Sequence, residues 1–183
     1  MAAQEGHVEC LSLLGQHGAD LSQLCLDGWA PIHEACQSGR SAALSFLLAL
    51  GAAKDVNLLS KKDEQDDGST PATLCSANGH VKCLALILDQ DETDLDGTDT
   101  DGYTAVHEAC KYDQWKNLLF LINRGAEINT KNADGCTPLD LARMYGHPDC
   151  VRLLRRHRAV GTSVEDLPLV SEADKVGRRL LLN

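Results

Sequence analysis

The chain has 183 residues, of which 43% are hydrophobic and 4% are aromatic, and its formal net charge is −10. This length is enough to bury a core, whereas the lack of a long apolar run and of a basic, apolar start argues against a membrane span and a signal peptide. Residues 1–150 carry 23 acidic and 10 basic side chains, so we expect neither nucleic acid nor membrane as a partner. Eight cysteines without a secretory signal predict reduced thiols and a cytoplasmic or nuclear protein.

In chain order, the sequence repeats a unit that begins with Asp-Gly. The dipeptide predicts a turn, because glycine tolerates a positive φ, and a short helix, a second aliphatic helix and a polar connector follow it. Thr-Pro at the start of the short helix supplies a cap and a first-turn proline. The spacings of 40, 34 and 33 residues give expected units at 1–26 (partial), 27–66, 67–100, 101–133 and 134–159. One unit cannot bury its own apolar face, so we expect the units to stack.

Three units depart from this pattern. The first lacks its turn and almost all of its first helix, and the second carries an insertion between Gly51 and Asp67 that predicts a longer, charged finger or loop. The fourth has Asp113 where the glycine that ends the first helix belongs. Residues 160–183 leave the repeat, and we expect a tail with a short helix from Ser171 that covers the end of the stack.

Two segments, "GHVECLSLLGQHGADLS" and "DGCTPLDLA", resemble the ankyrin repeat, whose signature is a period near 33 with T-P-L-H-x-A. The resemblance covers residues 2 to about 159. It implies an all-α ankyrin-repeat solenoid of stacked helix–turn–helix units with β-turn fingers. It also implies a non-catalytic module or adaptor that binds another protein on its concave face, without a cofactor, and we expect the chain to be a monomer on its own.

The tetrapeptide His-Glu-Ala-Cys occurs twice, starting at His33 and at His107. Each copy offers at most two ligands, whereas zinc needs four, or three plus water. The copies lie two repeats apart, which is roughly 20 Å at the spacing of packed helices, so they cannot share one ion. We therefore predict that both copies are structural. The ankyrin resemblance implies that each imidazole bonds backbone between neighbouring turns.

The acidic segment 89–101, "DQDETDLDGTDTD", is similar to a calcium loop. With Gly97 as the turn glycine, the closing ligand position falls on Tyr103, which cannot chelate, and with Gly102 the first position falls on Gly97. We expect a solvated finger that suits a Lys/Arg-rich partner segment, and a metal-dependent regulator remains an alternative function. No catalytic motif stands outside the repeat pattern, so we expect no catalytic residue, no metal ligand and no enzyme.

Turn tips and first helices line the concave face in ankyrin-like stacks. Side chains there that lack an obvious packing role predict partner contacts. These residues are Trp29, Glu34, Tyr103, Glu108, Tyr112, Met144 and Tyr145. Gln37, Leu74, Ala77, Lys111 and Leu141 are also expected to have no packing role. We expect Trp115 to cover the convex side, and Cys25 and Cys136, which lie near turns, to be the most accessible thiols.

Two segments carry further resemblances. Asn129 ends "LINRGAEIN", which is similar to the ankyrin sites used by an asparagine hydroxylase of the cytosol and nucleus, and this implies hydroxylation of Asn129. The segment "LPLVSEADKVGRRLLL" is similar to the C-terminal box of ankyrin proteins that recruit ubiquitin-ligase adaptors, but it lacks the full pattern. A substrate-receptor subunit of a ubiquitin ligase is therefore a second alternative function.

Overall fold

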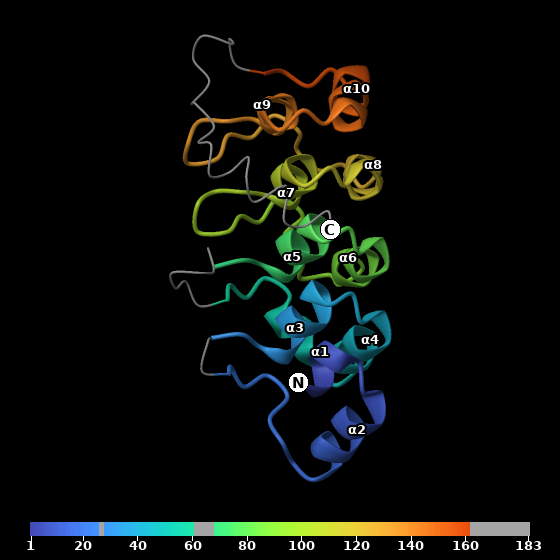
Figure 1. The fold of residues 1–183 in the computed structure, drawn as a ribbon. Coiled ribbons are helices and arrows are strands. Elements are labelled where there is room, and N and C mark those ends of the chain that lie inside the picture. The colour runs from blue at the N-terminus through green and yellow to red at the C-terminus, as the bar shows by residue number, and fades with distance from the viewer. Residues whose placement is uncertain (26–27, 61–67, 162–183) are drawn as a thin grey trace.

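The protein forms an elongated stack of helix pairs (Figure 1). The structure, a computed structural model, describes residues 1–25, 28–60 and 68–161. Within these residues it contains ten α-helices, one 3₁₀-helix (η1) and no strand. The elements in chain order are α1 (Ala2–Glu5), α2 (Val8–Gln16), α3 (Pro31–Gln37), α4 (Ser41–Ala49), η1 (Ala52–Asp55), α5 (Pro71–Ala77), α6 (Val81–Leu88), α7 (Ala105–Lys111), α8 (Trp115–Asn123), α9 (Pro138–Met144) and α10 (Pro148–Arg156).

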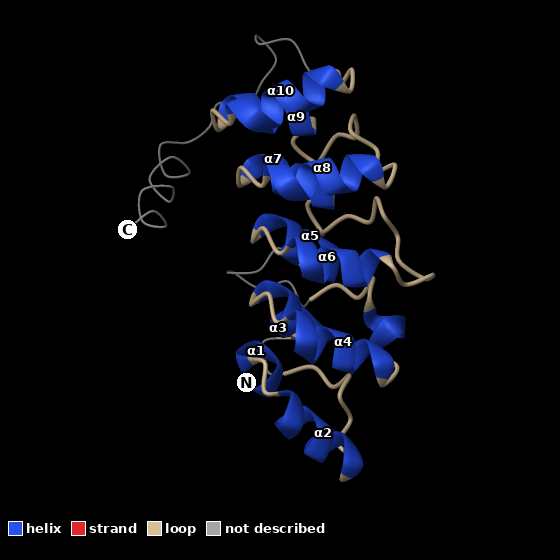
Figure 2. Ribbon diagram, turned by 90° about the vertical axis from the view of Figure 1, so that its right-hand side faces the viewer, coloured by secondary structure: helices blue, strands red, loops and turns tan. Residues whose placement is uncertain are grey.

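The odd-numbered helices form an inner layer beside the fingers, and the even-numbered helices form an outer layer (Figures 1 and 2). Each inner helix packs against the inner helices of the adjacent units, and each outer helix packs against its outer neighbours. The predicted all-α stack of helix–turn–helix units is therefore confirmed. The insertion of unit two begins with η1, whereas its residues 61–67 lie outside the described part of the chain.

Threonine caps start three of the inner helices. The side chains of Thr70, Thr104 and Thr137 accept hydrogen bonds from the backbone N–H three residues further on. This confirms the capping predicted from Thr-Pro at Thr70 and Thr137, and Thr104 caps in the same way without a following proline. Unit two has Ala30 at this position, and α3 therefore begins without a side-chain cap. Proline follows at the first helical position of α3, α5 and α9, where its missing N–H costs nothing.

Small side chains fill the contacts between inner helices. Ala35, Cys36, Cys75, Ala109 and Cys110 have no exposed surface. Because these side chains are short, the inner helices can approach closely, and larger aliphatic residues of both layers fill the rest of the core. Leu44, Leu84 and Leu118 of α4, α6 and α8 are likewise fully buried.

One repeat position joins each unit to the unit before it. The side chain that precedes the outer helix donates a hydrogen bond to a carbonyl near the end of the preceding inner helix, although its identity changes from unit to unit. The bonds are Arg40 Nε to Gln4 O (2.9 Å), His80 Nε2 to Gln37 O (3.0 Å), Gln114 Nε2 to Ala77 O (3.3 Å) and His147 Nε2 to Lys111 O (3.1 Å). This position therefore requires a side chain that is long enough to donate the hydrogen bond, and arginine, histidine and glutamine all meet this requirement.

Asp113 ends α7 in the conformation that glycine adopts in the other units. Its φ is 59°, and φ is 66° at Gly39 and 75° at Gly79. A side chain in this left-handed region costs roughly 1 kcal/mol, and aspartate tolerates it better than most residues. The Asp113 carboxylate also lies 3.5 Å from Nδ1 of His147 in the next unit.

Candidate functional site

Each finger is closed by a backbone hydrogen bond between the residues that flank its Asp-Gly dipeptide. These bonds run from Cys25 N to Trp29 O (2.8 Å), Ser60 N to Ser69 O (3.0 Å), Asp99 N to Tyr103 O (2.9 Å) and Asn132 N to Cys136 O (3.0 Å). The glycine of the Asp-Gly dipeptide has a positive φ in every finger, as at Gly102 (78°). The prediction of turn fingers is thus confirmed, and neighbouring fingers are joined by Ala133 N donating to Asp101 O at 2.9 Å.

Both histidines of the His-Glu-Ala-Cys segments are buried and bonded to backbone. His33 Nδ1 accepts from Ala30 N (3.1 Å), and its Nε2 donates to Leu58 O (2.8 Å) of the following connector. His107 Nδ1 accepts from Thr104 N (3.2 Å), and its Nε2 donates to Cys136 O (3.2 Å) of the following finger. Burial lowers the pKa of His107 to about 4, so this imidazole is neutral at physiological pH. The predicted role of both imidazoles in bonding backbone between units is confirmed.

Two aspartates of the acidic segment accept hydrogen bonds from backbone N–H groups, in their own finger or in the next connector. Asp99 Oδ1 accepts from Asp101 N (2.9 Å) and Tyr103 N (2.8 Å), and Asn132 Oδ1 accepts from Cys136 N in the same way one unit later. Asp96 Oδ1 accepts from Glu127 N (2.9 Å) of the next connector. Among the described residues, no group of three or more His, Cys, Asp and Glu side chains could hold a metal ion. These carboxylates are therefore turn-forming groups in the present arrangement.

The predicted contact residues differ widely in exposure. Tyr112 is 44% exposed, whereas Trp29, Tyr103, Met144 and Tyr145 are half-buried and pack against the core. The expectation that Trp29 and Tyr103 have no packing role is wrong, because each ring lies edge-on to the buried histidine of its own unit, with centroids 6.0 and 5.8 Å apart.

The inner helices correct three further expectations. Leu74 and Leu141 are 7% and 2% exposed, so both belong to the core. Glu108 is 8% exposed, and its carboxylate lies 3.9 Å from Lys111 Nζ. Glu34 of α3 is half-buried. Of the residues named from the sequence, the structure therefore brings the groups from Tyr103 to Tyr112 together around unit four, while Trp29 and Glu34 lie in unit two.

Lys111, which was expected from the sequence to have no packing role, lies against two aromatic rings of unit four. Lys111 Nζ is 4.7 Å from the centroid of the Tyr103 ring and 5.3 Å from that of Tyr112. Tyr103 Oη in turn donates to Asp134 Oδ2 on the next finger at 3.4 Å. The repeat register placed Lys111 beside Glu108 and Tyr112 on the first helix, but it did not indicate that the lysine packs on the tyrosine rings.

The accessible thiols are Cys10 and Cys25, whereas Cys136 is only 1% exposed. The expectation for Cys25 agrees with this, but the one for Cys136 is wrong. The Cys136 thiol lies under Met144, with the two sulfur atoms 4.0 Å apart, and burial raises its pKa. Cys150, which fills the position of Cys10 in the last unit, is buried, and its thiol lies 3.9 Å from Ala109 O of the preceding unit.

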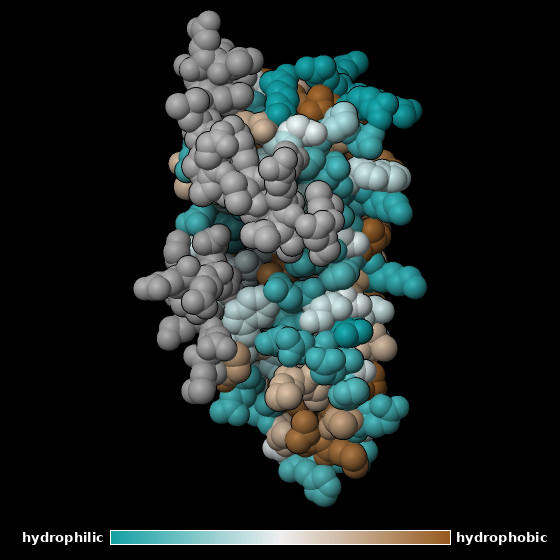
Figure 3. Space-filling model, viewed as in Figure 1, coloured by the Kyte–Doolittle hydropathy of each residue, from teal (hydrophilic) through white to brown (hydrophobic). Residues whose placement is uncertain are grey.

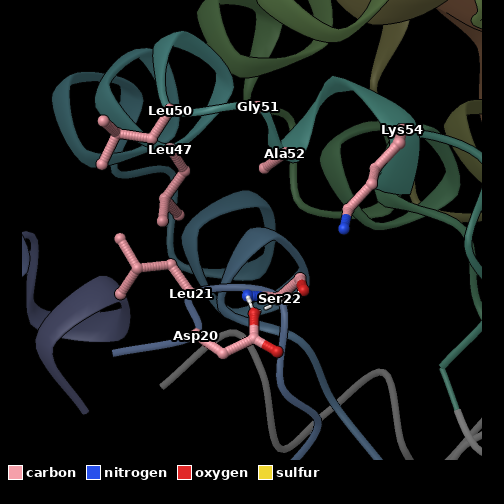
Figure 4. Close-up of a pocket in the computed structure, with 8 residues that line it drawn as sticks. All are labelled: Asp20, Leu21, Ser22, Leu47, Leu50, Gly51, Ala52 and Lys54. Atoms are coloured by element: carbon pink, nitrogen blue, oxygen red, sulfur yellow. Dashed lines mark hydrogen bonds between the residues drawn. The ribbon is translucent and has the colours of Figure 1, made fainter. Parts of the chain in front are cut away.

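A small hollow lies between the first two units, lined by Asp20, Leu21, Ser22, Leu47, Leu50, Gly51, Ala52 and Lys54 (Figure 4). Its volume of about 100 Å³ is below the several hundred Å³ of typical small-molecule pockets. Hydrophobic residues gather near this end of the stack (Figure 3), where the exposed ones include Leu13, Leu14 and Leu50. The hollow is thus too small to indicate a substrate site.

A family model for ankyrin repeats (3 copies) matches residues 1–59 and 52–132, and a single ankyrin repeat model matches residues 134–165. The chain belongs to the ankyrin repeat family. The fingers and inner helices of this chain therefore correspond to the turn tips and first helices that line the concave face in ankyrin-like stacks. None of the described helices is long and apolar enough to cross a membrane.

Several curated proteins are similar to this ankyrin stack. Human SH3 and multiple ankyrin repeat domains protein 2 is 32% identical over 156 residues, which cover 84% of this chain and 8% of that protein. Target of rapamycin complex 2 subunit AVO2 of Saccharomyces cerevisiae is 30% identical over 128 residues, or 70% of this chain and 29% of that protein. Human protein phosphatase 1 regulatory subunit 27 is 37% identical over 73 residues, or 40% and 43%. The chain thus spans less than half the length of each relative.

Proposed function

We propose that this ankyrin stack is a non-catalytic module that holds a segment of a partner protein against its fingers and inner helices. The observation that carries the proposal is the set of aromatic side chains on the fingers and at the ends of the inner helices, with Trp29 in unit two, Tyr103 and Tyr112 in unit four and Tyr145 in unit five, where Tyr112 is 44% exposed. Aromatic residues are enriched at the centres of protein interfaces, where they contribute much of the binding energy.

The names of two relatives support such a role. One is a subunit of target of rapamycin complex 2, and another is a regulatory subunit of protein phosphatase 1. Both are described as parts of protein assemblies, which is consistent with a protein-binding role for the repeats that they share with this chain. We propose a domain of residues 1–159 with a tail at 160–183, and we leave the identity of the partner open, because ankyrin surfaces serve unrelated partners.

The charge of the body supports a basic partner segment. Residues 1–150 carry 23 acidic and 10 basic side chains. Asp91 and Glu92, in the connector between the outer helix α6 and the finger of unit four, are exposed, and no ion pair involving either is found among the described residues. Exposed charges of this kind raise the association rate of an oppositely charged partner and make it depend on salt. Asp99 is unsuitable for testing this effect, because its carboxylate bonds the backbone of its own finger.

A matched pair of exposed aromatics tests the proposal. Tyr112 at the end of α7 is 44% exposed, and Trp115 at the start of the outer helix α8 is 43% exposed. We would select random twelve-residue peptides on the wild-type stack and measure their affinities by fluorescence anisotropy. Tyr112→Ala is expected to weaken binding by about tenfold or more, while Trp115→Ala leaves it unchanged. Peptides that respond only to Trp115→Ala, or no selected peptide at all, would refute the proposal.

Other functions predicted from the sequence gain less support. The segment similar to a ubiquitin-ligase recruitment box, and the helix expected from Ser171, lie outside the described residues. A metal-dependent role for segment 89–101 competes with the backbone hydrogen bonds that Asp96 and Asp99 make. Hydroxylation of Asn129 remains a prediction. Its side chain is exposed, although Oδ1 accepts from Val160 N at 2.7 Å, and peptide mass spectrometry after exposure to the hydroxylase would detect the added oxygen.

A further inference from the structure

Lys111, the last residue of α7, carries a cation into the face proposed to bind the partner. Because the Cα–Cβ bonds of a helix tilt toward its N-terminus, the lysine stem runs back along α7 toward the finger. Its ammonium lies near the rings of Tyr103 and Tyr112, at 4.7 and 5.3 Å from their centroids. The side chain is 22% exposed, so the cation is largely shielded but is still accessible to a group of a bound partner.

The ammonium of Lys111 has hydrogen-bonding capacity that the described residues leave unused. An ammonium offers three N–H donors and no acceptor. The carboxylate oxygen paired with it, Glu108 Oε1, is 3.9 Å away, which is an ion-pair distance rather than a hydrogen bond. No other acceptor in the described part of the chain bonds Nζ. Burial is the largest single influence and opposes the charge, but Glu108 together with Tyr112, Tyr103 and Tyr145 outweighs it, so the pKa of Lys111 lies above its ordinary value.

We propose that Lys111 binds a single carboxylate, from an aspartate or glutamate of the partner segment. The tyrosine rings keep water away from two sides of the ammonium, and an ion pair is stronger where water is excluded. Burying a charge is costly, but Lys111 is already largely desolvated in the free protein, so the partner's carboxylate meets a preorganised cation. The inference rests on the proposed function, because it names the chemistry of the segment that the same face holds.

The surroundings of Lys111 restrict the rest of that segment. Glu108 lies beside the ammonium, and Asp134 contacts the hydroxyl of Tyr103. Asp140 is fully buried in α9 and pairs with Arg143 at 3.7 Å. Since the body as a whole is also acidic, a uniformly acidic peptide would be repelled. The partner segment is therefore basic overall, with one carboxylate placed opposite Lys111.

Two variants with opposite expected effects test this site. Lys111→Met keeps the aliphatic stem over the rings but removes the charge. Glu108→Gln keeps the shape of the side chain but removes the competing carboxylate. In peptides selected on the wild type whose binding requires Tyr112, we expect one Asp or Glu at a fixed position among Lys and Arg. Lys111→Met is expected to weaken their binding by about tenfold or more, and Glu108→Gln to strengthen it a few-fold.

A double-substitution cycle then locates the contact. The peptide Asp is changed to Asn, or Glu to Gln, and its affinity is measured against the wild type and Lys111→Met by fluorescence anisotropy. If the two charges touch, the peptide change no longer matters in the variant, because each change removes the same interaction. Additive losses, or Tyr112-dependent peptides without a required carboxylate, would overturn the inference while leaving the proposed function standing. Selection of no Tyr112-dependent peptide would overturn the proposed function itself.

Discussion

Replacing His107 is expected to destabilise the stack through the two backbone groups that its ring satisfies. Nδ1 accepts from Thr104 N and Nε2 donates to Cys136 O, each at 3.2 Å, and the side chain has no exposed surface. An unpaired buried polar group costs about 1–3 kcal/mol, so His107→Ala should lower the free energy of unfolding by about 3 kcal/mol. His107→Thr should cost less, about 1–2 kcal/mol, because Thr73 already fills this position in unit three and accepts from Thr70 N at 2.8 Å.

The same histidine links stability to pH. Its pKa is about 4 in the folded protein and about 6.5 in an unfolded chain. The unfolded state therefore binds the proton first as the pH falls, and stability that is present above pH 6.5 is lost on the way to pH 4. Between pH 7.5 and pH 5 the loss from this one group is about 2 kcal/mol. Both His107 variants lack this contribution.

Urea denaturation at pH 7.5 and pH 5, followed by circular dichroism, measures both effects. The wild type is expected to lose about 2 kcal/mol more on acidification than either variant, and exposed His17→Ala serves as a control that behaves like the wild type. If His107→Ala is as stable as the wild type at pH 7.5, the inter-unit bond does not support the fold. If its loss on acidification equals that of the wild type, the imidazole is not held neutral by burial.

Three further predictions follow from local geometry. Gly39→Ala should destabilise the protein more than Gly146→Ala does, by about 1 kcal/mol or more. Both glycines have a positive φ, but only at Gly39 would an added Cβ meet another group, the ring of His80 in the next unit, at 2.6 Å. Equal thermal midpoints of the two variants would contradict this. Asp113→Gly should change the free energy of unfolding by less than about 1 kcal/mol in either direction, because relief of the backbone strain offsets the lost carboxylate contacts with His147 and Cys150. A large destabilisation in urea would show that these contacts dominate. Labelling of the native protein with a thiol reagent, followed by mass spectrometry, should modify Cys10 and Cys25 first, because they are the exposed cysteines; rapid labelling of the buried ones would refute the packing.

The repeat register could be predicted from the sequence because it depends on local rules. Asp-Gly requires a positive φ, Thr-Pro caps and starts a helix, and small residues mark the packed face of that helix. These rules locate Thr104, Pro138 and Ala109 without knowledge of the neighbouring units. The stack follows because one unit cannot bury its apolar face alone.

Exposure within the fingers and inner helices could not be predicted in this way. Whether Tyr103 or Glu108 faces solvent depends on the next unit and on Lys111, whose long side chain reaches back over the finger. Cys136 was expected near the surface because it follows a turn, yet Met144 covers it. Such contacts depend on how long each side chain is and in which direction it points, and the composition and spacing of the sequence do not give this information.

Hydrogen–deuterium exchange of the stack with and without a selected peptide tests the central claim most directly. If the partner segment lies along the fingers and inner helices, bound peptide should slow exchange at the finger amides of residues 98–104 and 131–137 and at the end of α7. Exchange at the start of α8 and in the other outer helices should stay unchanged. Protection confined to the outer helices, with the fingers unaffected, would contradict the account.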